Sequence, residues 1–206
     1  MADGPNIQVP GWLIARLNSA GGNFAPRYEA SMYGPVNGFL ACYFPVHRRY
    51  LIKPQGKIRP AVWTELGGDD AVLRISLDSY SGEVLSRDEK GSEDTVKIPD
   101  FITVKASASL HQDRVVLLVE VKRNDETILA AQEQLGEYFE AFMDKTRADG
   151  TPLVTHLNGL LVAGNQAVMA SWTSGGEIQW SELVDMTGVE VDNFLKQITN
   201  ANWYLL

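Results

Sequence analysis

Residues 115–122 read VVLLVEVK and decide the fold that the sequence predicts. The run opens with five consecutive valines and leucines, which is typical of a strand covered on both faces, because a half-exposed strand alternates polar and apolar residues. Side chains two residues apart in a strand share a face, so Glu120 and Lys122 are expected side by side, away from Val119 and Val121. A buried charge is costly unless it is paired or bound. The pair therefore needs each other, solvent or a ligand.

The composition is that of an ordinary soluble globular protein. Of its 206 residues, 45% are hydrophobic and 21% are charged, which is enough to bury a full core in one domain. The single cysteine, Cys42, excludes an intrachain disulfide and a cysteine-rich zinc site, and it fits a reducing compartment. No apolar stretch is long enough to cross a bilayer, and the N-terminus lacks the pattern of a secretory signal. We therefore expect an intracellular protein, in the cytoplasm or nucleus, with no membrane partner.

The charge is unevenly distributed along the chain. A formal net charge of −8 argues against non-specific binding of nucleic acid, because neutralising phosphates requires lysine and arginine. Between Val46 and Thr64, however, the sequence has five such residues and no acid. This stretch is either a solvated hairpin or a strip that follows a phosphate backbone. The basic residues that would contact phosphates are Arg48, Arg49, Lys53, Lys57 and Arg59.

Four helices are expected in an α/β protein with one domain over residues 1–206. Apolar residues at helical spacing mark the ranges 10–20, 26–44, 126–149 and 189–200. We expect the second helix to be interrupted near Gly34 and Pro35 and to end at Pro45. The third should begin after Asn124 and Asp125, which are good capping residues, and run until Gly150.

Strands are expected between these helices, in a mixed central sheet. Apolar or alternating runs predict strands near 49–53, 71–80, 98–105 and 113–122, and two more within 157–172. The last two should meet at a turn formed by Gly164 and Asn165. Further turns are expected at 81–82, 86–95 and 111–112.

The stretch KIPDFITV, residues 97–104, supplies a second carboxylate. Asp100 follows Pro99 on the predicted strand, and its spacing to Glu120 leaves room for a strand, a turn and the returning strand. Asp100 on one strand is therefore expected to meet Glu120 on its neighbour. Such a pair offers hard oxygen ligands, which suit Mg²⁺ or Mn²⁺. Lys122 would lie within reach of anything that the ion holds.

Together these residues resemble the signature of the PD-(D/E)xK nucleases. The signature consists of Pro-Asp, here Pro99 and Asp100, and of an acid two residues before a lysine, here Glu120 and Lys122. The resemblance implies a restriction-endonuclease-like core, with a mixed sheet flanked by helices in the order αβββαβ. It covers roughly residues 26–172, and the helix at about 189–200 follows this core.

A second element extends the resemblance to the RecB-type branch of the family. The sequence QLGEY, residues 134–138, is similar to the QxxxY element of that branch. Its spacing puts Gln134 and Tyr138 on one helical face. The resemblance implies that both residues lie near the active site, where they position the nucleotide or the catalytic lysine.

The resemblance implies metal-dependent hydrolysis of phosphodiester bonds in DNA or RNA, with DNA placed first. Asp100, Glu120 and the Val121 carbonyl would hold one or two Mg²⁺ or Mn²⁺ ions. Lys122 would orient the attacking water or stabilise the charge of the transition state. Glu29 is a candidate for a further ligand, because it shares a helical face with apolar residues that point toward the sheet. Whether the enzyme cuts at ends or internally stays open.

Three interpretations remain. The first is the nuclease, and the second is a PD-(D/E)xK-fold module that binds nucleic acid or protein without cutting. The third is an α/β protein in which Glu120 and Lys122 form only a strand-end ion pair. Each residue also has an ordinary explanation: Glu29 favours a helix N-terminus, Gln134 is an exposed amide, and Tyr138 borders the core. The conjunction of the motifs favours the nuclease.

Overall fold

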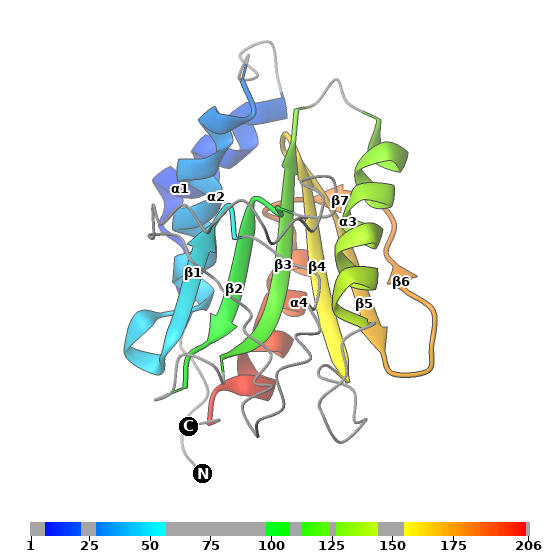
Figure 1. Cartoon of the computed structure of the whole chain (residues 1–206). Helices are drawn as coiled ribbons and strands as arrows, with labels where there is room; N and C mark the ends of the chain where they lie inside the picture. Colours follow the sequence, from blue (N-terminus) through cyan, green and yellow to red (C-terminus); the bar gives the residue numbers. More distant parts are fainter. Residues whose placement is uncertain are drawn as a thin grey trace, which may run out of the picture.

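The framework of the protein is a mixed β-sheet, seen face-on in Figure 1. The computed structural model describes residues 7–21, 28–56, 98–107, 113–123, 127–143 and 155–204. Within these ranges the sheet has seven strands, β1 (Tyr50–Pro54), β2 (Phe101–Lys105), β3 (Arg114–Lys122), β4 (His156–Ala163), β5 (Gln166–Thr173), β6 (Gln179–Trp180) and β7 (Val184–Asp185). Their order is β1-β2-β3-β4-β5-β6, and β7 pairs with β5. β3 and β4 are parallel and the other pairs are antiparallel, so the predicted mixed sheet is confirmed.

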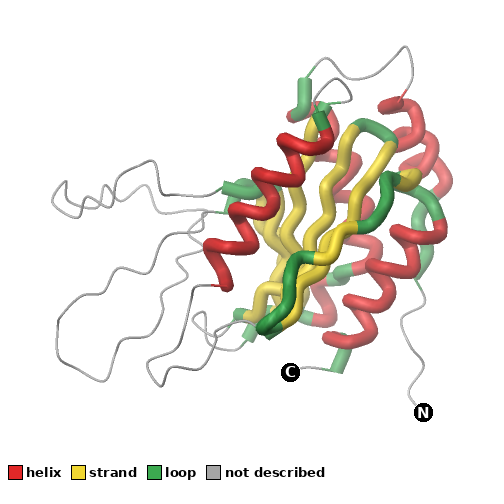
Figure 2. Tube along the Cα trace, turned by 90° about the vertical axis from the view of Figure 1, so that its right-hand side faces the viewer, coloured by secondary structure: helices red, strands yellow, loops and turns green. Residues whose placement is uncertain are grey.

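Helices cover both faces of this sheet, as Figure 2 shows from the side. The four α-helices of the described ranges are α1 (Gly11–Asn18), α2 (Ala30–Tyr43), α3 (Ile128–Met143) and α4 (Val189–Asn202). Buried side chains of α1, α2 and α4 share one apolar cluster, whereas α3 packs in the cluster on the opposite face. The short 3-10 turn η1 (Ser19–Gly21) follows α1, and a second one, η2 (Val46–Arg48), precedes β1. None of the described helices is long and apolar enough to cross a membrane.

The VVLLVEVK stretch forms most of β3, between β2 and β4. Its residues 115–121 are buried, as expected for a strand covered on both faces. Val119 and Val121 pack with α1, α2 and α4, whereas Leu118 packs with α3. Glu120 and Lys122 share the face of Leu118, because side chains alternate along a strand. The predicted division of this strand into two faces is therefore confirmed.

α3 follows β3 and buries a stripe at helical spacing. Its buried residues are Ala131, Leu135, Tyr138, Phe139 and Phe142. The helix crosses to the parallel strand β4, where Gly159 lies directly beneath the Phe139 ring. A Cβ built on Gly159 would come within 2.8 Å of this ring, so the glycine permits the close contact of helix and sheet.

The predicted interruption of the second helix is wrong, because α2 continues through Pro35. The proline ring nitrogen cannot donate a hydrogen bond to the carbonyl four residues earlier, at a cost of about 3 kcal/mol. Burying one large apolar side chain contributes about 1.5–3 kcal/mol, and α2 buries several of them. Packing therefore outweighs the lost hydrogen bond. The buried residues of α2 are Met32, Val36, Phe39, Leu40 and Tyr43.

The remaining predictions differ in their outcome. The helices at 10–20 and 189–200 and the hairpin at Gly164, which has φ 60°, are confirmed. Asp100 was expected on a strand, but β2 begins at Phe101. Pro99 has no N–H for the ladder, and the Asp100 carbonyl accepts the Gln55 N–H at 2.7 Å. The predicted features outside the described residues are the strand at 71–80, the turns at 81–82, 86–95 and 111–112, and the caps Asn124 and Asp125.

Substituting two glycines should distinguish close packing from backbone entropy. Gly159→Ala is expected to destabilise the protein by about 1–3 kcal/mol, since its methyl group would overlap the buried Phe139 ring. Gly136→Ala on α3 is the matched control, because its methyl group would meet no atom within 4 Å. It should stabilise the protein by about 0.5–1 kcal/mol through helix propensity. Urea unfolding measures both changes, and equal effects would contradict the packing described for Gly159.

Candidate active site

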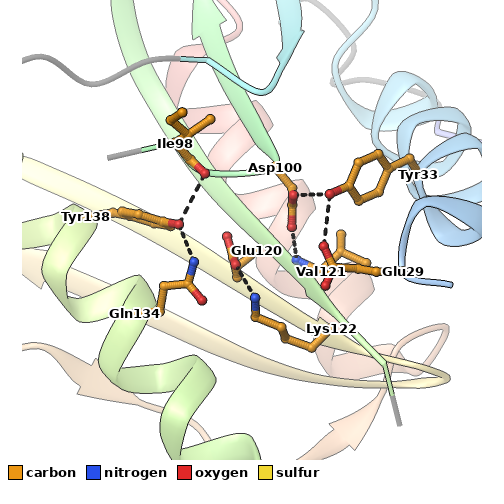
Figure 3. A network of polar contacts seen from close by, with 9 residues as sticks. All are labelled: Glu29, Tyr33, Ile98, Asp100, Glu120, Val121, Lys122, Gln134 and Tyr138. Carbon is orange, nitrogen blue, oxygen red and sulfur yellow. Dashed lines mark hydrogen bonds and ion pairs between the residues drawn. The ribbon is translucent and has the colours of Figure 1, made fainter. Parts of the chain in front are cut away.

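Asp100 is tied to the end of β3 through its side chain (Figure 3). Its Oδ2 atom accepts a hydrogen bond from the backbone N–H of Val121 at 2.7 Å. The antiparallel register pairs Phe101 with Val119, so the start of β2 lies beside the end of β3. Asp100 is therefore close enough to Glu120 for its negative charge to act on the Glu120 carboxyl group. The sequence predicted this meeting of two strands.

Glu120 is a buried carboxyl group with an incomplete set of partners. The residue is 2% exposed, and its Oε1 atom forms an ion pair with Lys122 Nζ at 2.7 Å. Oε2 is buried and has no hydrogen-bond partner among the described residues. Burial, and next the negative charge of Asp100, raise the pKa of Glu120 to about 7, although Lys122 acts in the opposite direction. The group therefore changes charge near neutral pH.

Tyr33, which the sequence analysis did not single out, connects two acids of the site. From α2 its hydroxyl group contacts Oε1 of Glu29 at 2.9 Å and Oδ1 of Asp100 (Figure 3). Burial and the neighbouring Asp100 raise the pKa of Tyr33, so the hydroxyl keeps its hydrogen. It can donate that hydrogen to only one carboxylate at a time. The i, i+4 spacing from Glu29 is the sequence signal that would have identified this residue.

Gln134 and Tyr138 meet on one face of α3, as their spacing predicted. Gln134 Nε2 donates a hydrogen bond to the Tyr138 hydroxyl at 2.6 Å, and the hydroxyl donates to the Ile98 carbonyl at 3.2 Å (Figure 3). Burial, and next the charge of Glu120, raise the pKa of Tyr138. Tyr138 therefore borders both the core and the carboxylates, and it ties α3 to the segment that leads into Asp100.

The cluster has the chemistry of a divalent-cation site. Asp100 and Glu120 offer carboxylate oxygens, the ligands that Mg²⁺ and Mn²⁺ prefer. Glu120 Oε2 is a buried acceptor with no donor in the part of the chain that the structure describes, and a cation would satisfy it. Among the residues that the structure describes, no three His, Cys, Asp or Glu side chains are grouped closely enough to enclose an ion. Tyr33 stands between Glu29 and Asp100, and the N–H of Val121 is used by Asp100.

The first two cations of the basic strip lie far from the carboxylates. Tyr50 at the start of β1 pairs with Lys105 at the end of β2, so Arg48 and Arg49 lie at the end of β2 opposite Asp100. The Arg48 guanidinium lies 4.5 Å from the centre of the Trp203 ring. Lys53, the third cation of the strip, forms an ion pair with Asp113 at 3.1 Å. Lys57 and Arg59 lie outside the described residues.

Comparisons with known proteins add no family to this geometry. The chain matches no protein-family model, no curated protein and no solved structure. The function must therefore be inferred from the side chains that the fold brings together. These are Glu29, Tyr33, Asp100, Glu120, Lys122, Gln134 and Tyr138.

The raised pKa of Glu120 predicts a pH-dependent stability. Between its ordinary value of 4.5 and about 7, the folded protein keeps a proton that the unfolded chain has released. The free energy of unfolding should therefore fall across this range as pH rises, by on the order of 3 kcal/mol. Glu120→Gln cannot titrate, so its stability should lack this fall.

Urea unfolding of both proteins at several pH values between 4 and 8 measures this difference. Other titrating groups are common to both proteins, so the difference between the two curves isolates Glu120. Parallel curves would show that the Glu120 carboxyl group titrates normally.

Proposed function

We propose that the protein is a divalent-metal-dependent nuclease that hydrolyses phosphodiester bonds, as the PD-(D/E)xK resemblance implies. One observation carries the proposal: three motifs far apart in the sequence converge on one buried carboxyl group, whose Oε2 atom has no hydrogen-bond partner among the described residues. Asp100 reaches it from the position before β2, Lys122 from β3 and Tyr138 from α3. An accidental match of three short motifs gives no reason for them to share one network.

The order of the elements supports the same proposal. Within the described ranges, α2, β1, β2, β3, α3 and β4 follow one another in the αβββαβ order that the resemblance implies. Asp100 precedes β2 and Glu120 lies near the end of β3, and these strands are antiparallel neighbours. α3 follows and carries the QxxxY element on the same side as Glu120. We therefore propose a restriction-endonuclease-like core, with DNA placed ahead of RNA as the partner.

In this mechanism the acids hold the metal and the lysine acts on the phosphate. Asp100 and Glu120 would bind Mg²⁺ or Mn²⁺, with the Val121 carbonyl and Glu29 as further ligands. The ion, when bound, polarises the phosphate and lowers the pKa of a bound water. Lys122 is paired with Glu120 at 2.7 Å, and its ammonium group would stabilise the extra negative charge of the transition state.

Gln134 and Tyr138 have a supporting part in this proposal. Tyr138 binds the Ile98 carbonyl, two residues before Asp100, and Gln134 fixes the Tyr138 hydroxyl. They would keep the Asp100 carboxylate at the position in which it faces Glu120. Groups that orient ligands in this way affect activity without touching the reacting atoms.

A binding module without activity is the second candidate. The ion pair between Glu120 and Lys122 and the two bonds to Asp100 favour it, because they already satisfy most of these charges. In this case the cluster would stabilise the fold and the protein would hold nucleic acid or another protein without cutting it. The unpartnered oxygen of Glu120 is the feature that this candidate leaves unexplained.

Two substitutions distinguish a residue that binds the metal ion from one that acts only on the transition state. Glu120→Gln removes a charged oxygen ligand, so both Mn²⁺ affinity and cleavage should fall. Lys122→Ala removes no ligand, so it should leave Mn²⁺ affinity intact or slightly higher while cleavage falls at least about a hundredfold. Lys196→Ala is the control, because it breaks a 2.7 Å ion pair with Asp192 on α4. It should change neither quantity.

The assay uses single- and double-stranded DNA and RNA with Mn²⁺, Mg²⁺ or a chelator, and calorimetry for the ion. Folding of each variant is checked first by its melting curve. Cleavage by Lys122→Ala at the parent rate would remove the lysine from the mechanism. Nucleic-acid binding without cleavage under any of these conditions would favour the binding module.

The basic strip gives a prediction of its own. Arg49 is exposed and has a left-handed backbone with φ 61°, which asparagine tolerates well. Arg49→Asn should weaken nucleic-acid binding for all sequences and reduce the salt slope by about one, with unchanged Mn²⁺ affinity. Arg16→Gln, which removes the same charge from α1, should have no effect. An unchanged salt slope for Arg49→Asn would favour the interpretation of the strip as a solvated hairpin.

A further inference from the structure

Tyr33 links two acids that lie far apart in the chain. Its hydroxyl contacts Glu29 one helical turn earlier and Asp100, 67 residues later. The ring packs edge-on against Phe101, with centroids 5.5 Å apart, so the hydroxyl cannot move far without losing this contact. Figure 3 shows the hydroxyl pointing between the two carboxylates. The proposed reaction does not otherwise use the Tyr33 side chain.

The hydroxyl determines how Asp100 is oriented. Val121 N–H holds Oδ2 and Tyr33 holds Oδ1, so both oxygens of the carboxylate are fixed from opposite elements. The Val121 bond alone would leave the group free to rotate about one oxygen. Because a metal ligand binds best when its lone pairs already point at the ion, the second bond pre-organises Asp100.

The same hydroxyl restrains Glu29, which is only half-buried at the start of α2. A glutamate in this position has several rotamers, and most of them lead into solvent. Repulsion by Asp100 and Glu120 favours those outward rotamers, since like charges disfavour one another. When the Tyr33 hydroxyl donates to Glu29 instead of Asp100, it offsets this repulsion and keeps the Glu29 carboxylate beside Asp100.

We infer that Tyr33 is a positioning residue: it presents Asp100 and Glu29 to the divalent cation and thereby sets the affinity of the site. The inference rests on the proposed metal-dependent function and adds a residue that the resemblance does not supply. Tyr33 touches neither the phosphate nor the reacting water in this assignment. Its effect should therefore appear in binding of the ion itself, with no nucleic acid present.

Tyr33→Phe tests the inference because it keeps the ring and removes only the hydroxyl. Mn²⁺ affinity, measured by calorimetry at a fixed pH of about 8, should fall about 10–100-fold, as is typical when a partner of a metal ligand is lost. Tyr43→Phe is the matched control on the same helix, because its hydroxyl donates to Asp192 at 2.9 Å. Both variants should lose a little thermal stability, but Tyr43→Phe should keep the parent affinity.

A double-mutant cycle with Glu29→Gln tests the link between the two residues. If Tyr33 acts partly through Glu29, adding Tyr33→Phe to Glu29→Gln should weaken Mn²⁺ binding less than it does in the parent. Additive losses would overturn the assignment to Glu29. Unchanged or tighter binding by Tyr33→Phe would overturn the whole inference and leave the proposed function standing. If the parent protein binds no Mn²⁺, both the inference about Tyr33 and the proposed metal-dependent function are wrong.

Discussion

Burial of the Glu120 carboxyl group is the constraint on which the rest of the site depends. β3 is covered by helices on both faces, so a charge at position 120 loses water, and its Oε1 atom pairs with Lys122. An uncompensated buried charge is costly, and the group responds with a pKa near 7. A proton, a lysine or a divalent ion can each reduce this cost. The ion pair with Lys122 is the solution in the described structure, and a divalent ion would be the solution in the proposed enzyme.

Each neighbouring element brings a polar side chain near this carboxyl group. β2 delivers Asp100, which is locked by the N–H of Val121, and α2 delivers Tyr33 with Glu29. α3 delivers Tyr138, which is bonded to the Ile98 carbonyl just before Asp100. The acids are therefore positioned by bonds that would persist without any ion. Such pre-organisation lowers the cost of binding, because the ligands need little rearrangement.

The basic side chains near β1 and β2 contact groups outside the candidate site. Lys105 is buried at the end of β2 away from Asp100, where its Nζ donates to the carbonyls of Arg48 at 2.7 Å and Trp203 at 3.3 Å. Arg48 packs on Trp203, and Lys53 pairs with Asp113. Part of the basic strip thus joins the end of α4 to the edge of the sheet. A run of basic residues in a sequence does not distinguish this structural use from a phosphate-binding surface.

The sequence by itself determined the features that depend on local periodicity. The apolar run of β3, the stripe of α3, the turn at Gly164 and the pairs Glu120–Lys122 and Gln134–Tyr138 all follow from spacing along one element. Tertiary structure alone decided the continuation of α2 through Pro35, the place of Tyr33 between Glu29 and Asp100, and the pairing of Lys53 with Asp113. Those outcomes depend on how much surface a helix buries and on which distant strand lies opposite. Local spacing carries no information about either, because packing energy is summed over residues that are remote in the chain.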